Sequence, residues 1–135
     1  MGQVNSEETV TDQAIAALLQ TTRTIAVIGW SPDPLRTSHR IADYLDRAGF
    51  TVYRVNPQAT GAFRHLDEAP DPIDLVVIFR RAEEAPLHVE EAIRKRARGV
   101  WLQLEVTTPD HGALARAAGL AYVEDRCIMV EHERI

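Results

Sequence analysis

Short apolar runs alternate with stretches of helical periodicity along most of the chain. Runs rich in β-branched and aromatic residues predict strands at 24–29, 51–56, 74–79, 99–104 and 120–125. These runs are apolar almost without interruption, which is typical of strands buried on both faces of a parallel sheet. The alternation of such strands with helices predicts an α/β fold, a single Rossmann-like domain with about five parallel strands and helices on both faces.

The polar and apolar positions between the strands predict amphipathic helices. Thr11 and Asp12 are helix-starting residues, so a first helix is expected to run from there to about Thr21. Three later helices are expected to end at glycines and to carry apolar stripes. The glycines are Gly49, Gly99 and Gly119, and the stripes are Ile41, Tyr44, Leu45 and Ala48, then Val89, Ala92, Ile93 and Ala97, then Leu114, Ala117 and Ala118. Segment 57–72 contains three prolines and predicts a loop, with a helical turn at about 66–69.

The length and composition indicate one ordinary globular domain. The 135 residues form a flexible N-terminal tail (1–10) and a folded domain (11–135) in this interpretation. A net charge of -5 argues against nucleic-acid binding, and the longest strongly apolar run, 75–79, is too short to span a membrane. The single cysteine, Cys127, excludes an internal disulfide and a cysteine-rich metal site. We expect a cytoplasmic protein, a monomer or weak homodimer, whose partner is a small molecule.

The best candidates for ligand contacts are the residues that follow each strand. In open parallel sheets ligands bind beyond the carboxyl ends of the strands, near the point where the strand order reverses. Hydroxyls, a helix start and arginines gather there and favour a phosphate-bearing ligand. Gln103 is a weaker candidate, and Trp101 is expected in the core.

Two common nucleotide-binding motifs are missing. Only Gly29 of the three dinucleotide-loop glycines is present, and Arg54 and Asn56 stand where an acidic residue would hold the ribose of NAD. No phosphate-binding loop of the G-x-x-x-x-G-K-[ST] type occurs. NAD and ATP chemistry are therefore disfavoured.

Four stretches together resemble a known family. The chain reads "IAVIGWSPDPLRTSHRIADYLDRAGFTVYRVNP", "DLVVIFRR", "VWLQL" and "EDRCIMVEH" in collinear order. These resemble the small CoA-binding proteins of bacteria and archaea, which are similar to the N-terminal domain of the succinyl-CoA synthetase α subunit. The resemblance implies a Rossmann-like domain that binds coenzyme A at the carboxyl edge of its sheet. The site residues that it implies are Gly29, Ser31, Pro32, Asp33, Pro34, Arg36, Thr37, Ser38, Arg40, Asn56, Pro57, Phe79, Arg80 and Arg81.

The chain departs from the family pattern in two places. Thr37 stands where the family commonly has proline, and the segment after Pro57 is shorter than usual. The resemblance also implies that catalysis by acyl-CoA synthetases needs a second domain with a phosphorylated histidine, which this stretch lacks.

The residues indicate no catalytic or metal site. The five histidines are dispersed, no two of them have metal-ligand spacing on one helix, and nothing in the sequence places one beside Ser31, Ser38 or Cys127. Cys127 is expected to be a buried small side chain, the alternative being a thiol that faces that of CoA. Two other functions stay open: an NAD(P)-linked oxidoreductase domain, and an interaction module that docks on a partner resembling an acyl-CoA ligase.

Overall fold

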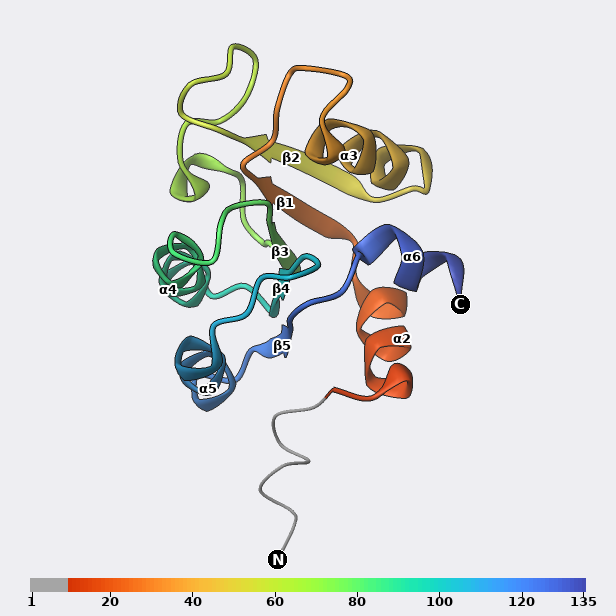
Figure 1. Cartoon of the computed structure of the whole chain (residues 1–135), viewed down its shortest axis with the longest axis vertical. Coiled ribbons are helices and arrows are strands. Elements are labelled where there is room, and N and C mark those ends of the chain that lie inside the picture. Colours follow the sequence, from red (N-terminus) through yellow and green to blue (C-terminus); the bar gives the residue numbers. More distant parts are fainter. Residues whose placement is uncertain (1–9) are drawn as a thin grey trace, which may run out of the picture.

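The computed structural model describes residues 10–135, so most of the expected tail lies outside the described residues. A five-stranded parallel sheet has the order β2-β1-β3-β4-β5 (Figure 1). The strands are β1 (Thr24–Ile28), β2 (Thr51–Val55), β3 (Leu75–Ile78), β4 (Gly99–Leu102) and β5 (Ala121–Val123). The helices are α2 (Asp12–Thr21), α3 (Thr37–Arg47), α4 (Ala85–Lys95), α5 (Pro109–Ala117) and α6 (Ile128–Glu133), with a 3₁₀ turn η1 (Leu66–Glu68).

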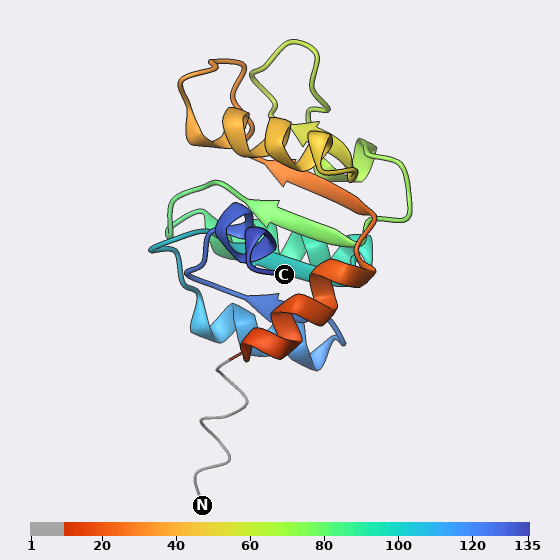
Figure 2. The ribbon, with the colours of Figure 1, turned by 90° about the vertical axis from the view of Figure 1, so that its right-hand side faces the viewer.

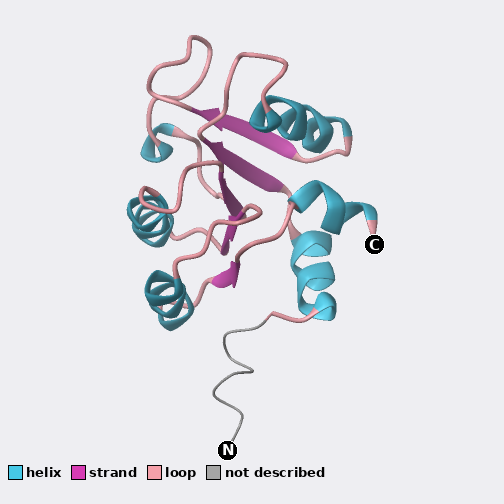
Figure 3. Cartoon of the chain, in the orientation of Figure 1, coloured by secondary structure: helices cyan, strands magenta, loops and turns pink. Residues whose placement is uncertain are grey.

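Helices cover both faces of the sheet, as the sequence predicts. One face carries α4, α5 and η1, and the other carries α2, α3 and α6 (Figures 1 and 3). Figure 2 views the second face, with α2, α3 and α6 in front of the strands. Successive strand residues alternate between the two cores because side chains in a strand point to opposite faces: Ala26 and Ile28 belong to the first core, Ile25 and Val27 to the second. No described helix is long and apolar enough to cross a membrane.

The predicted strands are confirmed in place, but each ends earlier than its apolar run. β1 ends at Ile28 and β3 at Ile78, one residue before the predicted ends, and β5 ends at Val123. The residues beyond these ends leave the sheet and enter the loops of its carboxyl edge. The first helix and the turn at 66–69 are also confirmed; the Thr11 hydroxyl accepts a hydrogen bond from the Ala14 N–H at 3.0 Å.

Gly99 does not end α4, contrary to the sequence-based prediction. Arg96 takes the left-handed conformation (φ 61°) at that helix end, and Gly99 is the first residue of β4. A Cβ at Gly99 would lie 3.2 Å from Cδ1 of Leu75 and 3.4 Å from Cβ of Ala121. Glycine at this position therefore allows close packing between neighbouring strands.

The predicted apolar stripe of α5 is also wrong. Leu114 is 52% exposed, and the helix buries Gly112 and Ala115 instead. The ring of Tyr122 occupies the space beside Gly112, where a Cβ would come within 2.6 Å of it. Helix α6 was not predicted from the sequence; its six residues bury Ile128 against the second face of the sheet.

Candidate functional site

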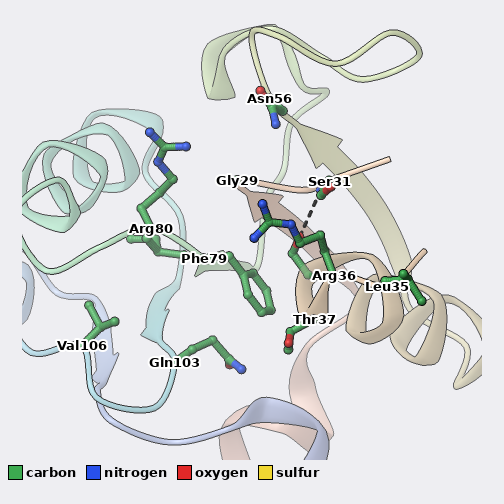
Figure 4. Close-up of a pocket in the computed structure, with 12 residues that line it drawn as sticks. Gly29, Ser31, Leu35, Arg36, Thr37, Asn56, Phe79, Arg80, Gln103 and Val106 are labelled. Carbon is green, nitrogen blue, oxygen red and sulfur yellow. Dashed lines mark hydrogen bonds between the residues drawn. The ribbon is translucent and has the colours of Figure 1, made fainter. Parts of the chain in front are cut away.

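A cavity opens at the carboxyl edge of the sheet, where the strand order reverses. The chain passes from β1 to β2 on one side and then returns to β3 on the other. The loops that follow β1 and β3 therefore diverge, which is the arrangement that creates a ligand crevice in open α/β sheets. The cavity has a volume of about 540 Å³ (Figure 4) and is lined by Gly29, Ser31, Leu35, Arg36, Thr37, Ser38, Asn56, Ile78, Phe79, Arg80, Gln103 and Val106.

At Gly29 the loop after β1 comes close to the backbone of the loop after β3. The φ of Gly29 is +83°, and a Cβ there would overlap the carbonyl oxygen of Phe79 and lie 2.9 Å from Cδ of Arg80. The N–H groups of Gly29 and Trp30 both donate to the carbonyl of Val55, at 2.9 and 3.3 Å. The first loop therefore leaves the sheet in a geometry that only glycine adopts without strain.

The first turns of α3 hold the loop that precedes it. The Ser31 N–H donates to the Ser38 hydroxyl at 3.0 Å, and Nδ1–H of His39 donates to the Ser31 carbonyl at 2.9 Å. Nη1 of Arg40 donates to the carbonyl of Leu35 at 2.9 Å. The side chains of Ser38 and Arg40 therefore stabilise the loop, and Arg40 does not line the cavity.

The residues at the tip of this loop shape a turn and lie outside the cavity lining. The Asp33 N–H donates to the Ser31 hydroxyl at 3.1 Å, and the Asp33 carboxylate accepts from the Leu35 N–H at 3.0 Å. Such local bonds are typical of turns that begin at aspartate. Pro32 and Pro34 flank this turn and do not line the cavity either.

The start of α3 presents unpaired backbone donors next to an unpaired cation. Arg36 precedes the helix in an extended conformation, and no side chain of the described residues caps this end. The first N–H groups of a helix carry partial positive charge and form an anion site when they are uncapped. Arg36 has no ion-pair or hydrogen-bond partner for its guanidinium within residues 10–135, and Figure 4 shows this group directed toward the space between Gly29 and Phe79.

The two arginines after β3 share one carboxylate. Glu84 lies 2.7 Å from Nη2 of Arg80 and 3.1 Å from Nη2 of Arg81. The hydrogen bond from Arg81 holds the pKa of the Glu84 carboxyl below its usual range, with Arg80 adding to the effect. Arg80 lines the cavity, whereas the Arg81 side chain is 79% exposed and lies outside the lining.

Asn56 uses both ends of its amide to connect the loops after β1 and β2. Its Nδ2 donates to the Trp30 carbonyl at 2.7 Å, and its Oδ1 accepts from the Gln58 N–H at 2.8 Å. Asn56 also borders a second, more enclosed cavity of about 280 Å³. Gly29 and Arg80, like Asn56, line both cavities. The lining of the second cavity further includes Val55, Pro57, Gln58, Arg64, His65, Leu66, Leu87, His88 and Glu91.

The comparisons with known proteins agree with this architecture. A family model described as a CoA binding domain matches residues 23–133. The chain belongs to this family. It is 35% identical over 123 residues to the uncharacterized protein YneT of Bacillus subtilis, covering 87% of this chain and 91% of YneT.

Two solved structures share the fold of this CoA-binding domain. A protein from Thermus thermophilus, cell-free ID.343, is 35% identical with a TM-score of 0.86, covering 93% of this chain and 98% of that one. A hypothetical protein from Pyrococcus horikoshii OT3 is also 35% identical, with a TM-score of 0.87 over 94% of this chain and 93% of that one. The five-stranded α/β fold is thus common to these relatives.

Thr37 of this CoA-binding domain is the first residue of α3. Proline is favoured at that position because its missing N–H would have no partner within the helix. Arg36 has φ -82° and ψ 145°, the extended conformation that a following proline requires. The backbone therefore fits the proline that the family resemblance implies at this position, and threonine leaves an additional N–H at the cavity.

The structure brings some of the sequence-predicted residues together and separates others. Those that line the larger cavity are Gly29, Ser31, Arg36, Thr37, Ser38, Asn56, Phe79 and Arg80, and Pro57 lines the smaller one. Ile78 and Val106 also line the larger cavity and were not predicted, and Leu35 lines it from within the predicted loop. Ile78 directly precedes Phe79, a predicted residue. Val106 could not be predicted from the sequence, because it reaches the cavity only where its loop folds back: the Val106 N–H donates to the Gln103 carbonyl at 3.1 Å.

The remaining chemically notable residues lie elsewhere. Trp101 is fully buried in the core, as predicted, and Cys127 is half-buried against the second face of the sheet. Within residues 10–135, no group of three or more metal-ligating side chains is positioned to hold a metal ion. The side chains lining the larger cavity are apolar, neutral polar or cationic, with no carboxylate among them.

Proposed function

We propose that this CoA-binding domain holds coenzyme A or an acyl-CoA at the carboxyl edge of the sheet. The observation that carries the proposal is the unpaired Arg36 beside the uncapped start of α3, at the switch point between β1 and β3. Backbone N–H groups, a helix dipole and a guanidinium together form a site for a phosphate group. Membership in the CoA binding domain family indicates which phosphate-bearing ligand this is.

Each part of the ligand has a place in this proposal. The phosphates lie against the N–H groups of Thr37 and Ser38 and against Arg36, with Arg80 as a second cation. The nucleotide end extends toward Asn56 and Pro57, where the smaller cavity offers an enclosed space of about 280 Å³. The Ser31–Ser38 and Arg40–Leu35 hydrogen bonds hold the loop ready before the ligand arrives, which reduces the entropy lost on binding.

The same geometry favours CoA over NAD. An NAD site needs a carboxylate at the end of the second strand to accept hydrogen bonds from the ribose diol. Asn56 occupies that position, and its amide is already bonded to Trp30 and Gln58. The function we propose is binding without chemistry of its own, in the cytoplasm, whose reducing conditions suit the free Cys127.

A thermal-denaturation series with CoA, acetyl-CoA, dephospho-CoA, NAD and NADP tests this proposal. A ligand that binds only the folded state raises the apparent stability by about 2.7 kcal/mol at 100 times its Kd. We expect CoA and acetyl-CoA to raise the Tm, and dephospho-CoA to raise it less because the 3′-phosphate is missing. Stabilisation by NAD alone would assign the domain to the oxidoreductase alternative, and no shift with any ligand would favour an interaction module.

A further inference from the structure

Gln103 is a nearly buried polar side chain at the far end of the larger cavity. It follows β4 directly, lines the cavity, and is only 9% exposed. Its Oε1 accepts a hydrogen bond from the backbone N–H of Ile128 at 3.1 Å, across 25 positions of the sequence. The first residue of α6 therefore fixes the orientation of the Gln103 amide.

That hydrogen bond decides which end of the amide faces the ligand. A backbone N–H is only a donor, so the atom of Gln103 that meets Ile128 is its oxygen. The NH₂ group therefore points away from the Ile128 N–H, and Figure 4 shows Nε2 directed toward the Thr37 side of the cavity. Within residues 10–135 this NH₂ group has no hydrogen-bond acceptor. Among the described residues the fully buried side-chain donor without a partner is Nε1 of Trp30, so Nε2 of Gln103 is open to the cavity. A polar group that is fixed in orientation and open to a cavity offers a hydrogen bond to a ligand that brings an acceptor.

The surroundings of Gln103 indicate what kind of acceptor this is. Figure 4 labels Phe79, Thr37 and Val106 around Gln103, and none of these side chains is charged. The cationic groups of the lining belong to Arg36 and Arg80, on the loops after β1 and β3. A neutral donor among uncharged side chains suits a neutral carbonyl, whereas the arginines and the start of α3 suit a phosphate.

We propose that Nε2 of Gln103 donates a hydrogen bond to a carbonyl of the ligand's amide-containing arm, an amide or thioester carbonyl. This inference rests on the proposed function, since CoA joins its phosphates to an arm with two amides and ends it in a thiol that forms thioesters. Gln103 thus determines specificity for the arm, while Arg36 and α3 bind the nucleotide phosphates. A ligand that has the phosphates but lacks the arm does not use Gln103.

The test compares two ligands on one variant. Gln103→Glu keeps an oxygen for the Ile128 N–H but replaces the cavity-facing donor with an acceptor. Isothermal titration measures the Kd of CoA and of adenosine 3′,5′-bisphosphate, which carries two of the phosphates without the arm. We expect Gln103→Glu to weaken CoA by about tenfold (~1.4 kcal/mol) more than it weakens the bisphosphate. The comparison cancels most of the repulsion between the new charge and the phosphates.

Two further variants keep the result interpretable. Gln103→Met removes the donor without adding charge, and we expect CoA alone to weaken with it. Gln20→Glu places the same charge change on the exposed surface of α2, and both affinities are expected to stay within about twofold of the wild type. Circular dichroism establishes whether each variant folds. If Gln103→Glu does not fold, the comparison of CoA with the bisphosphate is made on Gln103→Met.

The outcomes separate this inference from the proposed function. Equal weakening of CoA and bisphosphate in both Gln103 variants would overturn the role of Gln103 and leave CoA binding intact. Equal affinity of the wild type for the two ligands would also overturn it, because the arm would then contribute nothing. A wild type that binds neither ligand would overturn the proposed function itself.

Discussion

Two grooves at opposite edges of the same sheet show which features suit one of them to a phosphate. The groove at the amino edge is the larger, with a volume of about 890 Å³ against about 540 Å³ for the cavity at the carboxyl edge. Each has two arginines in its lining: Arg96 and Arg98 at the amino edge, Arg36 and Arg80 at the carboxyl edge. Size and the number of cations therefore do not distinguish them.

The direction of the helices does distinguish them. The amino-edge groove is lined by the body of α2 and by residues at the carboxyl-terminal ends of α2, α4 and α5, where carbonyl groups carry partial negative charge. Arg98 already interacts with such groups there, donating to the Thr21 carbonyl at 3.3 Å and lying 3.8 Å from the Asp74 carboxylate. At the carboxyl edge the start of α3 faces the cavity, and the guanidinium of Arg36 remains unpaired within the described residues. Among the described residues the guanidinium of Arg96 is also unpaired, but it lies among helix carboxyl ends, so an unpaired guanidinium meets the uncapped start of a helix at the carboxyl edge and not at the amino edge.

Removing the unpaired cation tests this comparison most strongly. We expect Arg36→Ala to weaken CoA binding about tenfold or more, because a hydrogen bond to a charged group contributes ~1.5–3 kcal/mol. The matched control is Arg98→Ala at the amino edge, which is expected to leave the Kd unchanged. Isothermal titration of both variants with CoA measures the difference, and equal losses would show that net charge rather than position governs binding.

The close approach at Gly29 is expected to give the next largest effect. Gly29→Ala introduces a Cβ that overlaps the Phe79 carbonyl and imposes a strained φ, so the free energy of unfolding should fall by ~1–3 kcal/mol. Gly61→Ala is the control, because Gly61 has a similar φ of +84° with nothing within 4 Å of its Cβ. Urea denaturation measures the free energy of unfolding of both variants, and the difference between their losses is the steric contribution of the Cβ at position 29. Identical losses would contradict the overlap with the Phe79 carbonyl.

A proline at the start of α3 sharpens the description of the carboxyl edge. Thr37→Pro should raise the free energy of unfolding by ~0.4–1 kcal/mol, since the backbone already has the required conformation and the unfolded chain loses freedom. Thermal denaturation measures this gain. A lower Tm would instead mean that the Thr37 N–H is bonded in the native loop. Weaker CoA binding by a more stable variant would assign that N–H to the phosphate.

The smallest expected effect comes from the carboxylate that competes for Arg80. Glu84→Gln removes the ion pairs with Arg80 and Arg81, so Arg80 becomes available to the ligand. Because exposed ion pairs are weak, we expect the Kd for CoA to fall only about two- to fivefold. Titration at low and physiological salt checks the electrostatic origin, since the gain should shrink as salt rises. A weaker affinity would show that Glu84 positions Arg80 for binding.

The sequence predicts the fold better than it predicts the candidate site. Periodicity identified all five strands because strands buried on both faces leave continuous apolar runs. It misassigned the end of α4, where Arg96 rather than glycine is left-handed, and the buried face of α5, where Gly112 receives the Tyr122 ring. Both errors arose where packing from another element outweighed the local preference.

By itself, the sequence determined the order of the elements, the glycine that follows β1, and the loops in which a phosphate-binding site would lie. Only the tertiary structure decided which polar groups remain available for a ligand. Arg36 is free, while Arg40 is bonded to Leu35 and Arg81 to Glu84. Gln103 is oriented by Ile128, which is distant in sequence. Local patterns set the course of the backbone, but the hydrogen-bond partners of a side chain depend on which distant segments fold against it.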